Sequence, residues 1–240
     1  MEYAQIGKPM DPREQFIFRV SKNKSFIDVG GLSTVCGNNE RISSAYEAGA
    51  NQLTLLDIEP LDRPWWSALR QRLDERGIKD CEFISRDFLT ALDLPKYDIV
   101  HSSGVLYHLP SPLHYVRRLR EITGEFCILT STTLNSTLHY QGRTLKIPDT
   151  AVIFLPALSG DEYEIVTGWF RDGGYGEVAE KELSLGGYSN LENYYPNWFM
   201  PTVASLKAMA ICAGFEIIDD APIGPNNCNY AYCLLLKPRA

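Results

Sequence analysis

The sequence predicts an α/β fold built on a doubly wound, mostly parallel sheet. Two observations support this class. Short apolar segments alternate with segments of helical periodicity through the first half of the chain, and several of the apolar segments end in glycine or in an acid. Strands separated by helices form parallel sheets through right-handed crossovers, and such sheets bind ligands at the carboxyl ends of their strands. We therefore expect a binding site at that edge.

The first half of this pattern begins with a strand over residues 25–29, which breaks at once into two glycines. Apolar residues at helical spacing predict a helix over residues 39–50, ended by Gly49. A second strand covers residues 53–56. A second helix covers residues 65–76 and is closed by glycine.

The next strands cover residues 81–85 and 97–102, the latter introduced by a proline. A helix over residues 113–122 stops before Gly124, and a fifth strand covers residues 125–130. Each strand is short and apolar, as expected for strands buried on both faces.

Residues 135–196 lose regular periodicity and are rich in glycine and aromatic residues. This stretch is too long for an ordinary connection, which favours a lid or a substrate-binding insertion. A last helix over residues 202–213 follows, and residues 215–218 and 230–237 form two terminal strands, paired as a hairpin.

The 240 residues, 45% hydrophobic and 22% charged, suit one α/β domain with an appendage. We divide the chain into a covering lead-in (1–24), a core (25–134), the insertion (135–196) and a terminal part of the core (197–240). The net charge of -7 argues against a large polyanionic partner. The lack of an apolar leader, of an apolar run of roughly 18 residues and of paired cysteines predicts a cytoplasmic protein without a membrane segment.

Three acids follow the first three strands and suit a mononucleotide-type cofactor. Asp57 is placed to accept hydrogen bonds from ribose hydroxyls, and Asp28 to hold the glycine turn or take an amino group of the cofactor. Asp87 is placed to accept from an adenine amino group, with Phe88 available to pack on the ring. For each acid alone, a helix cap or a surface turn is the alternative.

The segments IDVGG, LLDIEP, SRDF and YDIVHSSGVLYHLPSPLHYVRRL resemble the motifs of class I S-adenosylmethionine-dependent methyltransferases. GVLYHLPSPL is most similar to the branch that contains the tRNA wobble-uridine (5-oxyacetic acid) enzymes and related small-molecule methyltransferases. The resemblance covers residues 25–130 and, less closely, 197–218. It implies a Rossmann-like, seven-stranded sheet with an antiparallel last strand, S-adenosyl-L-methionine as cofactor, S-adenosyl-L-homocysteine as product, and no metal.

The cofactor-binding residues expected on this basis are Asp28, Gly30, Gly31, Gly37, Asp57, Ile58, Asp87, Phe88, Ser102 and Tyr107. The opening loop departs from the family pattern, because residues 32–34 stand where later glycines belong. Gly37 restores the pattern if residues 32–36 are an insertion. We expect this insertion to bulge toward the amino-acid end of the cofactor.

His108 follows the fourth strand and is the candidate catalytic base, or a source of an orienting hydrogen bond. A structural histidine fixing the turn at Pro110 is the alternative. The expected contacts to the acceptor come from the insertion and the segment after it: His139, Tyr140, Arg143, Tyr195 and Trp198. Solvated loop or packing onto the sheet is the alternative for these, and no cluster has the spacing of a metal site.

Three functions remain open. The first is O-methylation of a small molecule such as a natural product or a sugar-like compound. The second is a tRNA wobble-uridine (carboxy)methyltransferase, and the third is a non-catalytic cofactor-binding protein. A nicotinamide dehydrogenase is disfavoured because the GxGxxG fingerprint is absent. The sequence leaves the acceptor and the oligomeric state undetermined.

Overall fold

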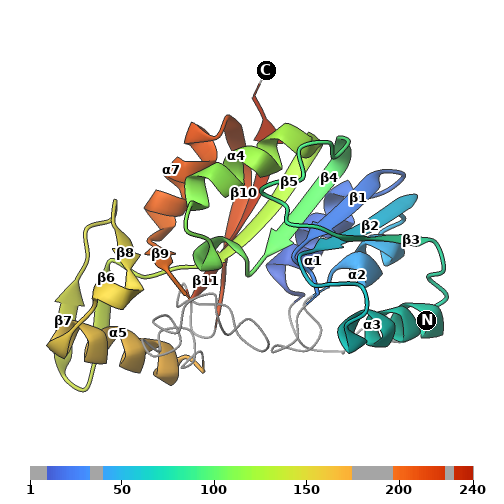
Figure 1. Cartoon of the computed structure of the whole chain (residues 1–240). Coiled ribbons are helices and arrows are strands. Elements are labelled where there is room, and N and C mark those ends of the chain that lie inside the picture. The colour runs from blue at the N-terminus through green and yellow to red at the C-terminus, as the bar shows by residue number, and fades with distance from the viewer. Residues whose placement is uncertain (1–9, 33–39, 175–196, 225–229, 240) are drawn as a thin grey trace.

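A computed structural model describes residues 10–32, 40–174, 197–224 and 230–239. Its centre is a seven-stranded sheet in the order β10-β11-β5-β4-β1-β2-β3 (Figure 1). β1 to β5 run parallel, and β11 runs antiparallel to both β5 and β10. The predicted sheet, with its antiparallel last strand, is confirmed. The strands are β1 (Ser25–Val29), β2 (Gln52–Asp57), β3 (Cys81–Ser85), β4 (Tyr97–Ser103), β5 (Thr123–Thr132), β10 (Phe215–Ile223) and β11 (Ala231–Pro238).

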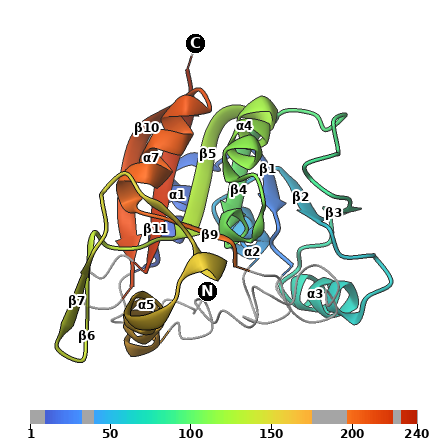
Figure 2. The same cartoon turned by 60° about the vertical axis from the view of Figure 1, so that its left-hand side comes forward.

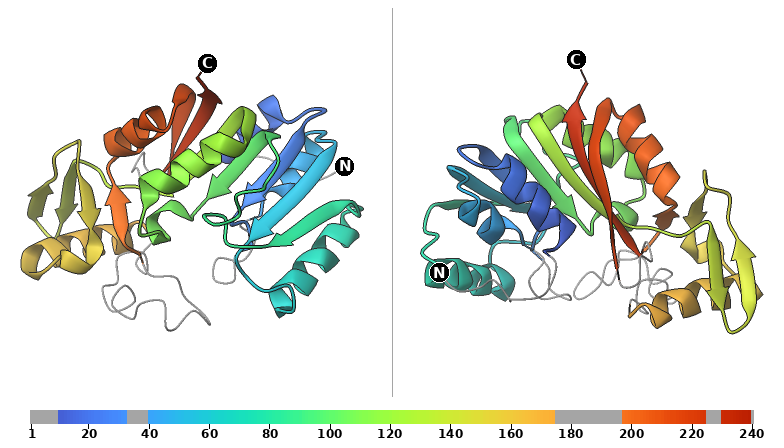
Figure 3. Two further views of the ribbon diagram at one scale, coloured as in Figure 1. Left: turned by 45° about the horizontal axis from the view of Figure 1, so that its top comes forward. Right: turned by 180° about the vertical axis from the view of Figure 1, so that it is seen from behind.

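Helices cover both faces of the sheet, as the two views of Figure 3 show. One face carries α1 (Pro12–Val20), α2 (Ile42–Glu47) and α3 (Pro64–Glu75), whose apolar residues share one buried cluster with β1 and β2. The other face carries α4 (Pro112–Ile122) and α7 (Val203–Cys212), which share a second cluster with β4 and β5. The sheet is therefore buried on both sides, which explains why its strands are almost continuously apolar.

Two helices differ from the prediction. The lead-in contains α1, which was expected only as a cover. Its start is specified locally, because Asp11 accepts a hydrogen bond from the Arg13 amide at 2.8 Å and Pro12 occupies the first helical position. The helix expected over residues 39–50 is shorter, since α2 begins only at Ile42.

The insertion contains more regular structure than the sequence predicted. β6 (Thr137–Tyr140) and β7 (Arg143–Lys146) form a hairpin, and β8 (Val152–Phe154) pairs with β9 (Phe199–Pro201). α5 (Gly160–Asp172) packs on this hairpin, and both lie to one side of the main sheet (Figure 2). Together they bury a third apolar cluster, which includes Val166, Phe170 and Met200. The prediction of an irregular segment is thus wrong for residues 137–172, where short half-exposed strands hid the periodicity.

Within the described ranges, none of the helices has the length and apolarity that crossing a membrane requires.

Candidate functional site

The carboxyl edge of the sheet begins with the glycine turn after β1. Gly30 has a φ of +77°, and a Cβ there would lie 2.3 Å from Cγ2 of Val105. A Cβ on Gly31 would lie 2.3 Å from Oδ2 of Asp28. Only glycine fits both positions without a shift of its neighbours, so Val105 and Asp28 can pack directly against the backbone of the turn.

Asp28 is fully buried beneath this turn. Its Oδ2 accepts a hydrogen bond from the Arg41 amide at 2.8 Å, and its Oδ1 lies 2.7 Å from Nδ1 of His101. This arrangement agrees with the first role predicted for Asp28, which is to hold the loop.

Asp57 ends β2 next to the turn and is 7% exposed. Its Oδ2 accepts from the Leu32 amide at 3.1 Å and its Oδ1 from the Glu59 amide at 3.2 Å. Burial is the main cause that raises the pKa of Asp57 to about 7, against the opposing effect of these amide hydrogen bonds. Ile58 follows it at the surface. A carboxylate is thus held beside the glycine turn, at the position predicted to accept ribose hydroxyls.

Asp87 lies at the surface after β3, where its Oδ1 accepts from the Leu89 amide at 2.9 Å. Phe88 is buried, and its ring meets that of Tyr115 edge-on, with 5.3 Å between the ring centroids. Oγ of Ser102 lies 2.6 Å from the Tyr115 hydroxyl oxygen. The side chains of Phe88 and Ser102 are therefore packed into the core under α4, and their expected contacts with the cofactor stay a prediction.

His108 and Tyr107 belong to a short 3-10 helix, η1 (Leu106–His108), which follows β4. Their rings are 4.3 Å apart between centroids. The Tyr107 carbonyl accepts a hydrogen bond from the Trp198 amide at 2.8 Å, which joins η1 to the segment leading into β9. The predicted residues His108, Tyr107 and Trp198 are therefore brought together.

The sequence reasoning missed Phe154, which is 40% exposed on β8. Its ring lies 6.2 Å from that of Trp198 and 5.2 Å from that of Phe199, its cross-strand partner. A lone aromatic residue in a stretch without clear strand periodicity gave no signal. We call Phe154, Trp198 and Phe199 the aromatic face.

Three residues predicted to contact the acceptor lie in the β6–β7 hairpin instead. His139 Nδ1 lies 3.0 Å from the Thr144 hydroxyl oxygen, and Arg143 forms ion pairs with two acids of α5 at 3.1 and 2.7 Å. The Tyr140 ring packs so closely on Gly168 of α5 that a Cβ there would come within 2.4 Å. Tyr140 and Arg143 fasten the hairpin to α5, and His139 contacts Thr144 within the hairpin. The hairpin lies away from β1 and β2 in Figure 1, which corrects the expected role of the three residues.

Gly37, Tyr195 and the predicted bulge of residues 33–36 lie outside the described residues.

Arg13 of α1 was also missed. Its Nη1 donates to the Ser103 hydroxyl at 3.0 Å, at the end of β4, and its Nη2 pairs with Asp11 at 2.5 Å. The start of α1 is thereby attached to the same edge of the sheet.

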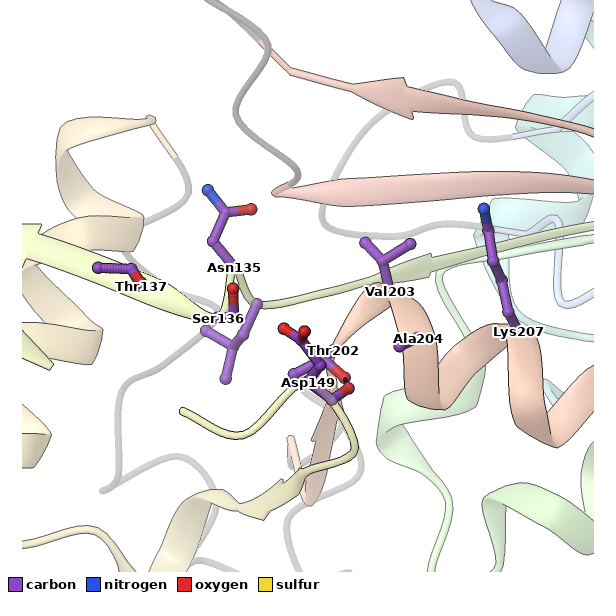
Figure 4. A pocket seen from close by; sticks show the side chains of 9 residues that line it. Asn135, Ser136, Thr137, Asp149, Thr202, Val203, Ala204 and Lys207 are labelled. Carbon is purple, nitrogen blue, oxygen red and sulfur yellow. Dashed lines mark hydrogen bonds between the residues drawn. The ribbon is translucent and has the colours of Figure 1, made fainter. Parts of the chain in front are cut away.

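A pocket of about 510 Å³ lies where the insertion meets α7 (Figure 4). Oδ2 of Asp220 accepts from Lys207 at 2.9 Å, so this ammonium group is already paired. Among the residues that the structure covers, no group of His, Cys, Asp and Glu could hold a metal ion. The pocket is lined by Leu134, Asn135, Ser136, Thr137, Asp149, Thr202, Val203, Ala204 and Lys207.

No protein-family model matches this sequence, and no curated protein matches it either. Solved structures do match over most of the chain.

The 1,6-didemethyltoxoflavin-N1-methyltransferase of Burkholderia thailandensis, with bound S-adenosylhomocysteine, has a TM-score of 0.57 and 12% identity, over 95% of this chain and 77% of that one. The magnesium protoporphyrin IX methyltransferase of Synechocystis PCC 6803 has a TM-score of 0.53 and 14% identity, over 91% and 75%. An S-adenosylmethionine-dependent methyltransferase from Mesorhizobium loti has a TM-score of 0.54 and 14% identity, over 94% and 96%. At these identities the likeness establishes the fold: the chain has the Rossmann-like fold of class I S-adenosylmethionine-dependent methyltransferases.

Proposed function

We propose that this protein is an S-adenosylmethionine-dependent methyltransferase that acts on a small molecule. The observation that supports this best is the pair formed by the Gly30–Gly31 turn and the buried Asp57 carboxylate, at the ends of neighbouring parallel strands. We place the amino-acid end of the cofactor at this turn, at the carboxyl edge of the sheet, and Asp57 suits its ribose diol. The residues present therefore fit the cofactor that the sequence motifs imply.

When bound, the cofactor supplies an electrophilic methyl group and its own leaving group. The chain must then hold the acceptor in line with that methyl group, and such orientation is worth roughly 7–11 kcal/mol of the barrier. η1 follows β4 at the same edge of the sheet, so His108 is the nearest candidate to an acceptor hydroxyl. With the cofactor bound, His108 would take the hydroxyl proton of the acceptor while the methyl–sulfur bond breaks and S-adenosylhomocysteine leaves.

The aromatic face supports a small acceptor with an apolar or aromatic body. It lies next to η1, because the Trp198 amide donates to the Tyr107 carbonyl. Flat apolar side chains bind such a body and exclude water from the reacting atoms. Enzymes of the same fold include the toxoflavin-precursor methyltransferase above and the mitomycin 7-O-methyltransferase, of which this chain covers 53%. We propose O-methylation, since His108 supplies the base that a neutral hydroxyl needs.

The test has two stages. Calorimetry with S-adenosylhomocysteine should show binding to the wild type and to His108→Ala alike. Turnover of a panel of hydroxylated small molecules should fall about 100-fold or more in His108→Ala. His139→Ala is the matched control, since that exposed histidine lies in the β6–β7 hairpin and should leave turnover unchanged. Absence of cofactor binding would rule out the proposed function, and full turnover by His108→Ala would remove His108 as the base.

A tRNA wobble-uridine enzyme is the second candidate, favoured by the GVLYHLPSPL segment. Such an enzyme, whether it uses S-adenosylmethionine or its carboxylated form, needs a basic surface for the RNA backbone, and the chain carries a net charge of -7. Retention on a tRNA column that weakens as salt rises would favour this candidate over a small-molecule acceptor.

A further inference from the structure

His101, at the end of β4, has no part in the function proposed above. Its Nδ1 lies 2.7 Å from Oδ1 of Asp28, and both side chains are fully buried. The two residues are direct partners in the parallel β1–β4 register. The sheet itself therefore fixes this pair.

The second oxygen of Asp28 bonds to one end of the segment that joins β1 to α2 and fills the space beside the other end. Oδ2 accepts from the Arg41 amide at 2.8 Å, immediately before α2. A Cβ on Gly31 would lie 2.3 Å from the same oxygen. The orientation of this one carboxylate therefore determines where the glycine turn and the start of α2 stand relative to each other.

Packing alone does not explain a histidine at position 101. Its ring stacks on Phe26 with centroids 6.1 Å apart and an interplanar angle of 18°, inside an apolar cluster. Its Nε2 is buried and has no hydrogen-bond partner among the residues that the structure describes, which costs stability. A phenylalanine would fill this space without that cost. What histidine adds is the hydrogen bond to Asp28.

We propose that His101 is a positioning residue for the cofactor: it orients Asp28, and through Asp28 it sets the glycine turn that receives the amino-acid end of S-adenosylmethionine. The inference rests on the function proposed above. The ring is fully buried and acts through Asp28, so its effect belongs to cofactor affinity and not to recognition of the acceptor.

The test compares wild type, His101→Phe and His101→Asn by calorimetry with S-adenosylhomocysteine. His101→Phe keeps the ring but cannot bond to Asp28, and its affinity should fall at least about tenfold. The amide nitrogen of His101→Asn can take the place of Nδ1, so this variant should stay within about threefold of wild type. The KM for the acceptor should be the same in all three.

The outcomes separate the two proposals. A wild type that binds no S-adenosylhomocysteine contradicts the proposed function. A wild type that binds, with His101→Phe binding equally well, overturns the role of His101 alone.

If His101→Phe does not fold, nitrogen-15 NMR of the wild-type imidazoles decides. The His101 ring resonances should shift when S-adenosylhomocysteine is added, because the turn that its partner supports becomes occupied. The resonances of the exposed His139 ring should stay in place. An unmoved His101 signal in a protein that binds the ligand would also overturn the inference.

Discussion

Asp57 is the residue whose ionisation should govern cofactor binding near neutral pH. Its pKa of about 7 arises mainly from burial, and an ionised carboxylate accepts hydrogen bonds from two ribose hydroxyls better than a neutral one. The affinity for S-adenosylhomocysteine should therefore rise about tenfold between pH 6 and pH 8. Calorimetry at both pH values measures this. Asp57→Asn should bind S-adenosylhomocysteine weakly at both pH values. An equal rise in the affinity of that variant would show that the pH dependence comes from another group.

The same raised pKa has a consequence for folding. The folded state holds the Asp57 proton more tightly than the unfolded chain, whose carboxyl has a pKa near 3.8. The contribution of Asp57 to the free energy of unfolding therefore falls as pH rises from about 4 to about 7, and is constant above that. Urea denaturation at several pH values in this range measures the free energy of unfolding of the wild type and of Asp57→Asn. This free energy should fall less steeply with rising pH in Asp57→Asn than in the wild type.

Gly30 should tolerate substitution less well than other glycines with positive φ. Gly30→Ala combines a left-handed backbone, which costs about 1–2 kcal/mol, with a clash against Val105 that costs a further ~1–3 kcal/mol. Gly77→Ala is the control, because Gly77 has a φ of +78° and no atom within 4 Å of its Cβ position. Thermal unfolding should show a larger loss of stability in Gly30→Ala than in Gly77→Ala. Adding Val105→Ala should recover part of the loss in Gly30→Ala and none of the loss in Gly77→Ala. Equal losses in both alanine variants would show that the clash relaxes freely.

At the scale of the element, α1 depends on one partly buried arginine. Arg13 is 17% exposed and joins Asp11 to Ser103, whereas Arg19 of the same helix is 50% exposed in its pair with Asp219. Arg13→Ala should lower the free energy of unfolding by about 1–3 kcal/mol, and Arg19→Ala by less than about 1 kcal/mol. Chemical denaturation measures both. Similar small losses would mean that apolar packing alone holds α1 in place.

The sequence predicted the elements whose burial shows in their composition. Strands β1 to β5 are largely apolar runs, several of which end in glycine or acid, and the site at their carboxyl edge followed from that pattern. α1 was missed because its apolar stretch is short, and the insertion because its strands alternate weakly. The burial of Phe88 and Ser102 against Tyr115 was not foreseen, because sequence position does not tell which face of the sheet a side chain takes. The contact of the aromatic face with η1 depends on a main-chain hydrogen bond that no side-chain pattern encodes.

At the scale of the whole molecule, two of the three buried clusters should respond differently to mutation. Phe170 is fully buried in the cluster of the insertion, and Leu119 is fully buried between α4 and the sheet. Phe170→Ala should lower the free energy of unfolding by about 3–5 kcal/mol, and residues 137–172 should be the first to lose structure. Hydrogen exchange should quicken there, while the affinity for S-adenosylhomocysteine stays within about threefold.

Leu119→Ala is the matched variant in the main core. It should weaken cofactor binding and protection of the sheet together. Loss of cofactor affinity in Phe170→Ala to the same extent would show that the two regions unfold as one.

The insertion leaves and rejoins the main sheet at adjacent points. The Leu134 amide donates to the Pro201 carbonyl at 3.0 Å, and the Thr202 hydroxyl caps α7 directly afterwards. A segment whose two ends are this close can be replaced by another of different length without stretching the strands that hold the cofactor. On the function proposed above, exchanging residues 135–200 between proteins of this fold should transfer acceptor preference and leave the edge that carries Asp57 and the glycine turn in place.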